Sequence, residues 1–415
     1  MEGARQTAGA GSDPRPRHQL TSETLQRLCT LVIPHLIPGE PVLVYVLHQW
    51  RRIGHLTIEP QILATLYGDR YNRIVIVTGN LDLSGSNRAV VECLDERIVV
   101  VETDWRDVIA LGAVDGGLLD LRHLHFLAMS PRKLIVTFWR AVVEGRRPKL
   151  LHLPDSLRER AHGRLAGHGI DPSAPFAVFH TRTMRYLPGE THHGHRTAAI
   201  EAYEPSLRRI LDAGYQVLRI GEPGLETWER APEGYLSLAD AFPEGRWIDL
   251  VACADCAFAT AQNSGPIWVV AAFGKPSLRT STPLEHLNLP YNDDLSMFKR
   301  YRRVGDDRFL SYREILDARL PVVFRDADFA ERGIELVENT AEEIDAATAE
   351  MLGKLNGGWS PDTARHERFR AMGRAYEDGL RAEPWIVAED LDFYGYAHPF
   401  GWVARAMLDD DDFLT

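Results

Sequence analysis

The chain has 415 residues, of which 45% are hydrophobic and 26% charged, a composition typical of a globular protein with two domains. Its net charge of -12 argues against a nucleic-acid partner, because nucleic acids select basic surfaces. No apolar run approaches about 18 residues, so no transmembrane segment is expected.

The first twenty residues contain no apolar segment of the kind found in secretory signals. We therefore expect residues 1–20 to form a disordered tail on a cytoplasmic protein. The four cysteines lie mostly in apolar runs, which favours buried thiols. Cys253 and Cys256 form a CxxC pair without a second such pair, so a structural role is favoured over a redox or zinc site.

Residues 21–170 show the alternation of strands and helices that is typical of an open parallel sheet wound with helices on both faces. A helix is expected over residues 21–31, capped by Thr21 or Ser22. Further helices are expected to end at Gly68, to begin at Ser130 and to begin at residues 155–156. Three near-continuous apolar runs predict strands buried on both faces: residues 41–48, 73–78 and 97–102.

A turn-rich stretch at residues 171–175 marks the expected domain boundary, and the pattern then repeats to residue 355. Thr340 begins a capping box that predicts a helix reaching about Leu355. Residues 356–415 are expected to form a polar and aromatic C-terminal extension. Strands of the second domain are expected at residues 176–180, 215–221 and 257–261.

The stretch after residue 261 is the most informative part of the chain. Pro266 suits the first turn of a helix, and Gly274 suits its C-terminal cap. Asn263 or Ser264 is expected to cap this helix, which leaves backbone N–H groups and the positive dipole end beside Gly265. Such a helix end can bind an anion such as a diphosphate, so the stretch predicts a phosphate-binding site. The alternative interpretation is an ordinary capped helix that binds no ligand.

In an open α/β sheet, ligands bind beyond the carboxyl ends of the strands. In the loop after the first strand, Pro60 is expected to keep the helix from beginning much before Thr57. His55 would then lie in the turn and serve as a general base, with Glu59 orienting it. Alternatively, His55 caps the helix or packs under the loop. Further candidates nearby are Arg51, Arg52 and Gly54.

The loops of the second domain supply a second group of candidates. Arg182 is placed to clamp a diphosphate, with a surface ion pair as the alternative. Glu285 is placed either to accept hydrogen bonds from ribose hydroxyls or to lie on the surface. The histidines at 192, 193 and 195 favour a flexible polar lid over a metal site. The full set of candidate site residues in this domain is His180, Arg182, Arg185, Gly221, Glu222, Asn263, Ser264, Gly265, Arg279, Thr282 and Glu285.

Four segments together resemble a family of bacterial putative glycosyltransferases found in gene clusters for surface polysaccharides and natural products. They are RIGHLTIEP (52–60), FAVFHTR (176–182), GYQVLRIGEPG (214–224) and CAFATAQNSGPIWVVAAFGKPSL (256–278). GIELVENTAEEI (333–344) resembles the segment near that family's C-terminal end, so the similarity spans roughly residues 40–355. The SGPIWVVAAFGKP stretch is more distantly similar to the donor segment of lipopolysaccharide heptosyltransferases.

The resemblance implies the GT-B fold, in which two Rossmann-like domains face each other across a cleft. It implies that the candidates of the C-terminal domain bind a nucleotide-sugar donor. It also implies a small-molecule or glycan acceptor in the N-terminal domain, with Arg51, Arg52 and Gly54 on the acceptor side. The heptosyltransferases tend to carry an Asp where the titratable candidate here is His55. No DxD motif stands at a strand end before the donor segment, so neither a metal nor a cofactor is expected.

Three functions remain open at this point, and the sequence leaves the oligomeric state open as well. The leading one is an inverting, metal-independent glycosyltransferase. A nucleotide-sugar epimerase or hydrolase would share the fold, and so would a binding protein that catalyses nothing.

Overall fold

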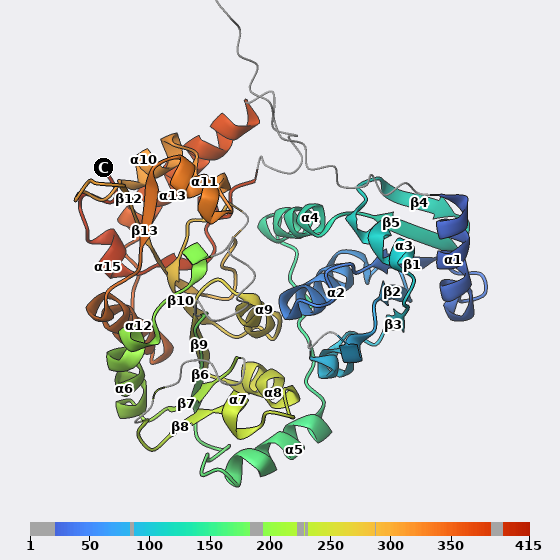
Figure 1. Ribbon diagram of the computed structural model, residues 1–415, viewed down its shortest axis with the longest axis horizontal. Coiled ribbons are helices and arrows are strands. Elements are labelled where there is room, and N and C mark those ends of the chain that lie inside the picture. The colour runs from blue at the N-terminus through green and yellow to red at the C-terminus, as the bar shows by residue number, and fades with distance from the viewer. Residues whose placement is uncertain are drawn as a thin grey trace, which may run out of the picture.

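The computed structural model describes residues 21–83, 87–182, 194–221, 228, 231–286, 288–382 and 393–415. These residues form two α/β domains, which lie side by side in Figure 1 with the N-terminal domain on the right. The expected tail, residues 1–20, lies outside the described residues. Among the described residues, no helix is both long and apolar enough to cross a membrane.

The N-terminal domain is built on a five-stranded sheet in the order β3-β2-β1-β5-β4. The first three strands lie where the apolar runs predict them: β1 (Val42–Val46), β2 (Ile74–Thr78) and β3 (Ile98–Glu102). One prediction is wrong, because β4 (Gly117–Leu121) runs antiparallel to β5 (Leu124–Ala128) at the edge of the sheet. The turn between them places Arg122 at a φ of 70°, a left-handed conformation that is uncommon for a residue with a side chain.

Helices cover both faces of this sheet, as the sequence predicts. On one face, α1 (Ser22–Val32) and α3 (Arg106–Ala110) pack on the valines of β1. Thr21 caps α1 by accepting a hydrogen bond from the backbone of Thr24. On the other face lie α2 (Ile53–Tyr67) and α4 (Pro131–Val143), and this face points toward the second domain.

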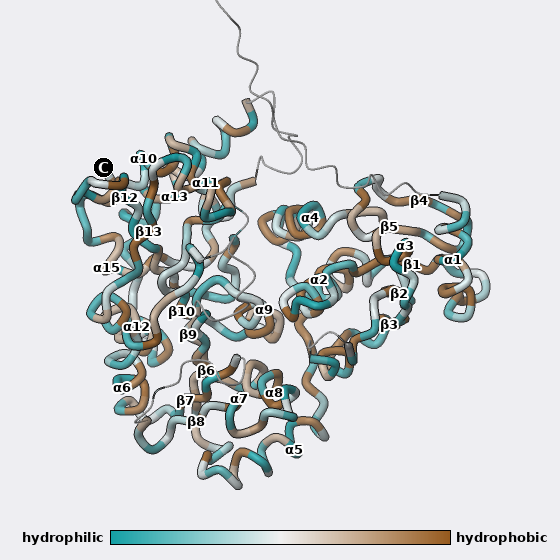
Figure 2. Tube along the Cα trace, in the orientation of Figure 1, coloured by the Kyte–Doolittle hydropathy of each residue, from teal (hydrophilic) through white to brown (hydrophobic). Residues whose placement is uncertain are grey.

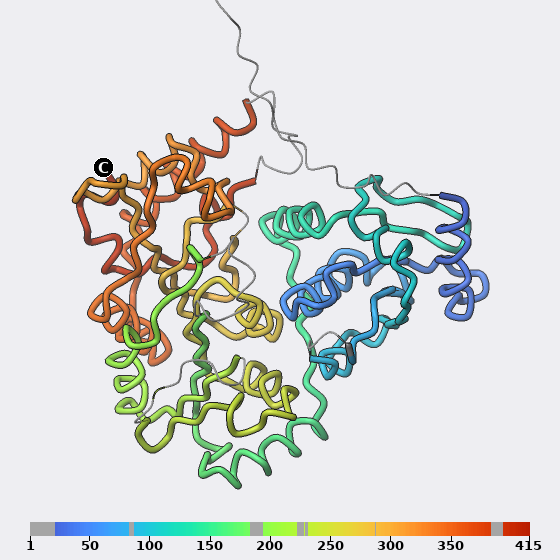
Figure 3. Tube along the Cα trace, in the orientation of Figure 1, coloured from blue at the N-terminus to red at the C-terminus, as the bar shows by residue number. Residues whose placement is uncertain are grey.

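The chain passes from the first domain to the second once, between α4 and α5 (Asp155–Ala166), which Figure 3 shows in green. This passage contacts the second domain before residue 171. The backbone N–H of Leu151 donates to the carbonyl of Ala272 at 2.9 Å, and Arg158 forms an ion pair with Asp255 at 3.0 Å. Helix α5 therefore packs against α8 (Trp247–Asp255) of the second domain.

The second domain is built on a seven-stranded sheet in which every pairing is parallel. Its order is β14-β11-β10-β9-β6-β7-β8. The strands are β6 (Phe176–His180), β7 (Gln216–Arg219), β8 (Tyr235–Ser237), β9 (Phe258–Ala261), β10 (Ser277–Thr282), β11 (Leu295–Phe298) and β14 (Trp402–Val403).

Helices cover both faces of this sheet too. One face carries α7 (Leu238–Ala241), α8 (Trp247–Asp255) and α9 (Gly265–Ala272). The other face carries α6 (Glu204–Asp212) and α12 (Ala341–Leu355), and α12 begins at the capping box that the sequence predicts. The remaining elements are β12 (Arg300–Arg303), α10 (Tyr312–Asp317), α11 (Asp326–Glu331) and β13 (Ile334–Val337).

The segment expected as an extension packs into the second domain. Helix α13 (Thr363–Arg381) places Phe369 between aromatic rings, with its centroid 4.4 Å from that of Tyr312 and 6.1 Å from that of Phe298. Strand β14 follows and pairs with β11 at the edge of the sheet, before α15 (Arg405–Leu408). Residues after 355 therefore share one hydrophobic core with the second domain.

A second core cluster runs across the boundary between the domains. Trp139 of α4 packs against Trp268 of α9 with ring centroids 5.7 Å apart, and Phe138 packs against Tyr291 at 5.9 Å. Figure 2 shows α4 and α9 as largely apolar where they approach this boundary. The domains therefore meet through buried apolar side chains of α2, α4 and α9.

Candidate functional site

A buried carboxylate lies at the start of α2, where β1 ends. Glu59 is 0% exposed, and its two oxygens have different partners. Oε2 accepts a hydrogen bond from the hydroxyl of Tyr45 at 2.6 Å, and Oε1 lies 2.6 Å from Nδ1 of His55. His55 itself is 23% exposed, so its ring reaches from a buried anchor to the solvent.

The position of His55 differs from the one expected. Helix α2 begins at Ile53 and contains Pro60 in its interior, so His55 lies in the first helical turn and not in the preceding loop. In a helix, residues four apart lie on one face, and this brings Glu59 onto His55. The partnership expected between these two side chains therefore arises from helical spacing.

Tyr45 is a member of this cluster that the sequence did not single out, and His48, one of the polar residues after the first strand, was given no role from the sequence. Burial raises the pKa of Tyr45 well above its ordinary value, and the neighbouring Glu59 raises it further. Burial lowers the pKa of His48, although Glu59 acts in the opposite direction. Both residues belong to β1 or follow it directly, and this position at the carboxyl end of a central strand is the signal that could have identified them.

The acceptor-side arginines lie at the rim of this cluster. Arg51 and Arg52 are exposed, and the guanidinium of Arg51 lies 5.0 Å from the ring centroid of Trp50. Trp50 in turn packs over Gly79, where a Cβ atom would be 2.3 Å from the indole. An aromatic side chain and two exposed cationic side chains therefore directly precede α2, the helix that carries His55.

The donor helix α9 begins at Gly265 with Pro266 in its first turn, and Gly274 follows it at a φ of 73°. The expected side-chain cap is absent, because Ser264 makes no capping hydrogen bond and its hydroxyl lies 3.4 Å from the carbonyl of Gln262. Asn263 instead donates to Glu285. No side chain of the described residues caps the first-turn N–H groups, which suits an anionic ligand.

The N-termini of α2 and α9 meet at two glycines. A Cβ atom on Gly54 would lie 3.2 Å from Cα of Gly265, and a Cβ atom on Gly265 would lie 3.3 Å from the backbone nitrogen of Gly54. The positive dipole ends of two helices from different domains therefore converge on one point. His55 stands one residue after this contact, and Ser264 stands one residue before it.

Two further loops of the second domain end beside α9. Arg182 follows β6, and its backbone N–H donates to Oε1 of Gln262 at 2.7 Å. His180 is 7% exposed, with Nδ1 lying 3.2 Å from the carbonyl oxygen of Ile220. Gly221 has a φ of 143°. The expected site residues Arg185 and Glu222, together with His192 and His193, lie outside the described residues.

Three of the expected donor residues are buried. Arg279 is 0% exposed and binds Asp294 at 3.0 Å and Asn288 at 2.6 Å. Thr282 is 0% exposed, and its hydroxyl donates to the carbonyl of Thr280. Glu285 is 6% exposed and pairs with Arg196 at 2.6 Å. Their polar groups serve contacts within the protein, and Arg279 of β10 forms a buried ion pair with Asp294.

His195 is buried and paired, which differs from the flexible polar lid that the sequence predicts. It is 8% exposed, and its Nδ1 lies 2.5 Å from a carboxylate oxygen of Asp326. The CxxC pair is buried as well, and burial raises the pKa of Cys256 to about 12. Among the described residues, no three His, Cys, Asp or Glu side chains gather as they would around a metal ion.

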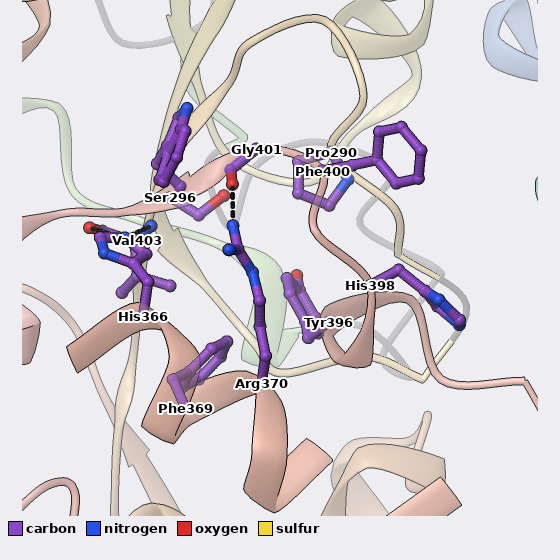
Figure 4. Close-up of a pocket in the computed structure, with 11 residues that line it drawn as sticks. Pro290, Ser296, His366, Phe369, Arg370, Tyr396, His398, Phe400, Gly401 and Val403 are labelled. Carbon is purple, nitrogen blue, oxygen red and sulfur yellow. Dashed lines mark hydrogen bonds between the residues drawn. The ribbon is translucent and has the colours of Figure 1, made fainter. Parts of the chain in front are cut away.

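Two pockets lie away from this site. The pocket in Figure 4 has a volume of about 10 Å³, room for about one water molecule, and Arg370 crosses it to donate to the carbonyl of Gly401. A surface pocket of about 390 Å³ lies at the amino ends of β6 and β9, between Arg158 and Lys275. Ligands of open α/β sheets bind at the opposite ends of the strands, where His55 and Ser264 lie.

No protein-family model matches the sequence, and no curated protein matches it significantly. A glycosyl transferase of family 9 from Veillonella parvula is similar in structure, with 13% identity and a TM-score of 0.46, over 76% of this chain and 97% of that chain. An E. coli ADP-heptose lipopolysaccharide heptosyltransferase II has 12% identity and a TM-score of 0.35, over 63% and 90% of the two chains.

The E. coli heptosyltransferase WaaC, whose structure contains ADP, has 11% identity and a TM-score of 0.33, over 62% of this chain and 91% of that chain. These similar structures are glycosyltransferases. The fold of this chain is two α/β domains, each built on a largely or wholly parallel sheet, as the sequence predicts. At such low identity and TM-score, its chemistry is argued from its own residues.

Proposed function

We propose that this protein is a glycosyltransferase that moves a sugar from a nucleotide-diphosphate donor to a hydroxyl or amine of a small-molecule or glycan acceptor. The observation that carries the proposal is the meeting of α2 and α9. There a histidine backed by a buried carboxylate stands beside a helix N-terminus without a side-chain cap. A transferase requires both parts, one to deprotonate the acceptor and one to stabilise the leaving diphosphate.

His55 serves as the general base. Glu59 holds Nδ1 of the imidazole as a hydrogen-bond donor, so Nε2 carries the lone pair. Nε2 takes the proton of the acceptor nucleophile while that nucleophile attacks the anomeric carbon. The attack comes from the face opposite the leaving group, and the configuration at this carbon is inverted. The imidazolium that forms is stabilised by the carboxylate of Glu59.

The second domain stabilises the leaving diphosphate. Backbone N–H groups at the start of α9 face the negative charge that develops as the bond to the sugar breaks. Arg182, with Arg185 beside it in the sequence, supplies cationic side chains to the same phosphates. This arrangement neutralises the diphosphate with a helix dipole and arginines, so the reaction proceeds without a metal ion or cofactor.

The first test is a thermal-shift titration of the full chain with UDP, GDP, TDP, CDP and ADP, each with and without Mg²⁺. A diphosphate at a hundredfold its dissociation constant adds about 2.7 kcal/mol to the free energy of unfolding. We expect one nucleotide to stabilise the protein without Mg²⁺. The proposal fails if none of the five does so under either condition.

Product analysis with the matching nucleotide sugar then separates the remaining reactions. A transferase consumes the donor rapidly and completely only when an acceptor is present, whereas an epimerase or hydrolase converts it completely alone. A binding protein leaves the donor unchanged, and replacing His55 with Ala alters nothing. We expect slow donor hydrolysis without acceptor and loss of this residual rate in His55→Ala.

A further inference from the structure

The pocket of about 390 Å³ at the amino ends of β6 and β9 has no part in the proposed reaction. Its walls come from α5, from the turn that leads into β6, and from residues at or just after the ends of α8 and α9. Neither His55 nor Ser264 borders it. Its volume lies within the range of about 300 to 1,000 Å³ that small-molecule sites occupy, so it is large enough to hold a ligand of its own.

The polar part of this pocket has an excess of cationic side chains. Arg158 and His162 lie four residues apart on α5, so both project from one face of that helix. Nε of Arg158 donates to the two oxygens of Asp255 at 3.2 and 3.0 Å, and Nε2 of His162 lies 3.1 Å from Oδ2 of the same carboxylate. Lys275 lines the pocket as well. The one carboxylate in the lining is therefore already paired, and positive charge remains.

Two of these cationic groups keep donors that the protein does not use. Arg158 uses Nε for Asp255 and Nη1 for Asp155, at 2.7 Å, and its Nη2 has no partner among the described residues. Lys275 is half-buried, yet within the part of the chain that the structure describes its ammonium has neither a hydrogen-bond nor an ion-pair partner. Guanidinium and ammonium donors of this kind bind the oxygens of carboxylates and phosphates.

The wall formed by the turn before β6 is mainly apolar and is held in place. Pro172, Pro175 and Phe176 contribute apolar surface, and each proline fixes its own φ angle. Asp171 stabilises the turn, because its Oδ1 accepts hydrogen bonds from the backbone N–H of Ser173 at 2.9 Å and from the hydroxyl of the same residue at 2.6 Å. A wall that is already ordered binds a ligand without a further cost in conformational entropy.

We propose that this pocket binds a small organic anion, in which a carboxylate or phosphate group is attached to a compact apolar body. The oxyanion lies between Arg158 and Lys275, and the apolar body packs against Phe176 and the two prolines. The site is separate from the proposed reaction, because substrates of an open α/β sheet bind at the carboxyl ends of the strands. The inference therefore does not depend on the proposed function.

The experiment is a ligand-observed NMR titration of the full chain with phenyl phosphate, benzoate, inorganic phosphate and benzyl alcohol. The nucleoside diphosphate that stabilises the protein is present at saturation to block the donor site, and it is left out if none of the five stabilises. Phenyl phosphate and benzoate differ in the oxyanion, inorganic phosphate lacks the ring, and benzyl alcohol lacks the charge. We expect at least one aromatic anion to bind about 10-fold more tightly than inorganic phosphate and benzyl alcohol.

Three variants locate the bound anion. Lys275→Met removes the ammonium and keeps an apolar side chain, and we expect it to weaken the aromatic anion about 10-fold. Ala174→Trp adds a large ring at a residue that lines the pocket, and we expect it to abolish binding. Arg303→Met is the matched control, because it removes one positive charge from an exposed residue of β12 outside the pocket, and we expect unchanged affinity. Lys275→Met decides alone if Ala174→Trp does not fold.

Four results would overturn the inference. The wild-type protein could bind neither aromatic anion. Inorganic phosphate could bind as tightly as both of them, which would mean an adventitious ion only, or benzyl alcohol could do so, which would mean an apolar crevice without selection for charge. Affinity that Lys275→Met leaves unchanged, or that Arg303→Met lowers equally, would place the anion elsewhere on the surface. When the expected losses are observed, the preference between phenyl phosphate and benzoate identifies the oxyanion that the site selects.

Discussion

Gly54 and Gly265 come from different domains and lie in direct contact. A Cβ atom on Gly54 would be 3.2 Å from Cα of Gly265, and a Cβ atom on Gly265 would be 2.9 Å from Cγ2 of Ile53. Each glycine stands in the first turn of its helix. Because neither carries a side chain, two positive helix ends approach closely enough to share one ligand.

Replacement of Gly54 by Ala is expected to force α2 and α9 apart. Overpacking of this kind costs about 1 to 3 kcal/mol, which exceeds the gain in helix propensity. Urea unfolding measures the change. Gly163→Ala is the control, since Gly163 lies in α5 with no atom within 4 Å of its added Cβ. We expect it to stabilise by about 0.5 to 1 kcal/mol. An equal gain in the free energy of unfolding in both variants would show that α2 and α9 accommodate the added methyl group without moving apart.

Glu59→Gln is expected to lower the initial rate of nucleoside diphosphate release by about 10²- to 10⁴-fold. The amide donates to Nδ1 of His55, and the proton of the imidazole then resides on Nε2, where the base is needed. Tyr45→Phe is the control, because it removes a hydroxyl from Glu59 and leaves the contact with His55 intact. We expect a rate within tenfold of wild type. Similar losses in both variants would contradict the orienting role.

Phe369→Ala is expected to destabilise the second domain by about 3 to 5 kcal/mol, the cost of emptying a large buried site. Phe369 is 3% exposed and lies between the rings of Tyr312 and Phe298. Chemical denaturation followed by tryptophan fluorescence measures the loss. Phe309→Ala, at a side chain 39% exposed, should change stability by less than about 1 kcal/mol. Equal effects would mean that α13 is peripheral to this core.

His286 should make stability depend on pH. Burial lowers its pKa to about 3, and Arg132 adds to the effect. In the unfolded chain the imidazole takes up a proton near pH 6.5, so its contribution to stability is complete above that pH and is lost as the pH falls toward 3.

Between pH 7 and pH 5 the wild-type protein should therefore lose about 2 kcal/mol more than His286→Asn. Urea titrations at the two pH values measure this difference. His123→Asn serves as the control, because His123 is exposed. Parallel losses in wild type and His286→Asn would show that His286 accepts its proton without unfolding.

The sequence predicts the central strands well because strands buried on both faces have little freedom in composition. The runs that become β1, β2 and β6 are apolar except for Thr78 and His180 at the ends of the last two, and each lies within the range expected. The start of α2 was placed too late because Pro60 lacks the N–H of an interior helical residue. Packing of α2 against α4 and α9 outweighs that one lost hydrogen bond.

Elements whose partners are far away in the sequence were not predicted. Strand β14 is two residues long and exists only because β11 lies beside it. The cluster of Tyr45, Glu59 and His55 combines a strand and a helix, and only the helical pair has a spacing that the sequence displays. The burial of Arg279 was equally hidden, since its partners Asp294 and Asn288 follow in a loop without a regular pattern.

The position of β14 in the second sheet constrains the order in which the two domains fold during synthesis. The second sheet begins with Phe176–His180 near its centre, yet one of its edges is Trp402–Val403. The N-terminal domain is complete once residue 152, whose backbone N–H donates to the carbonyl of Cys93, has left the ribosome, and domains fold in that order during synthesis. The second domain must instead wait with an open edge at β11 and uncovered aromatic rings. A nascent chain stalled near residue 360 would therefore carry a finished first domain and be a substrate for chaperones.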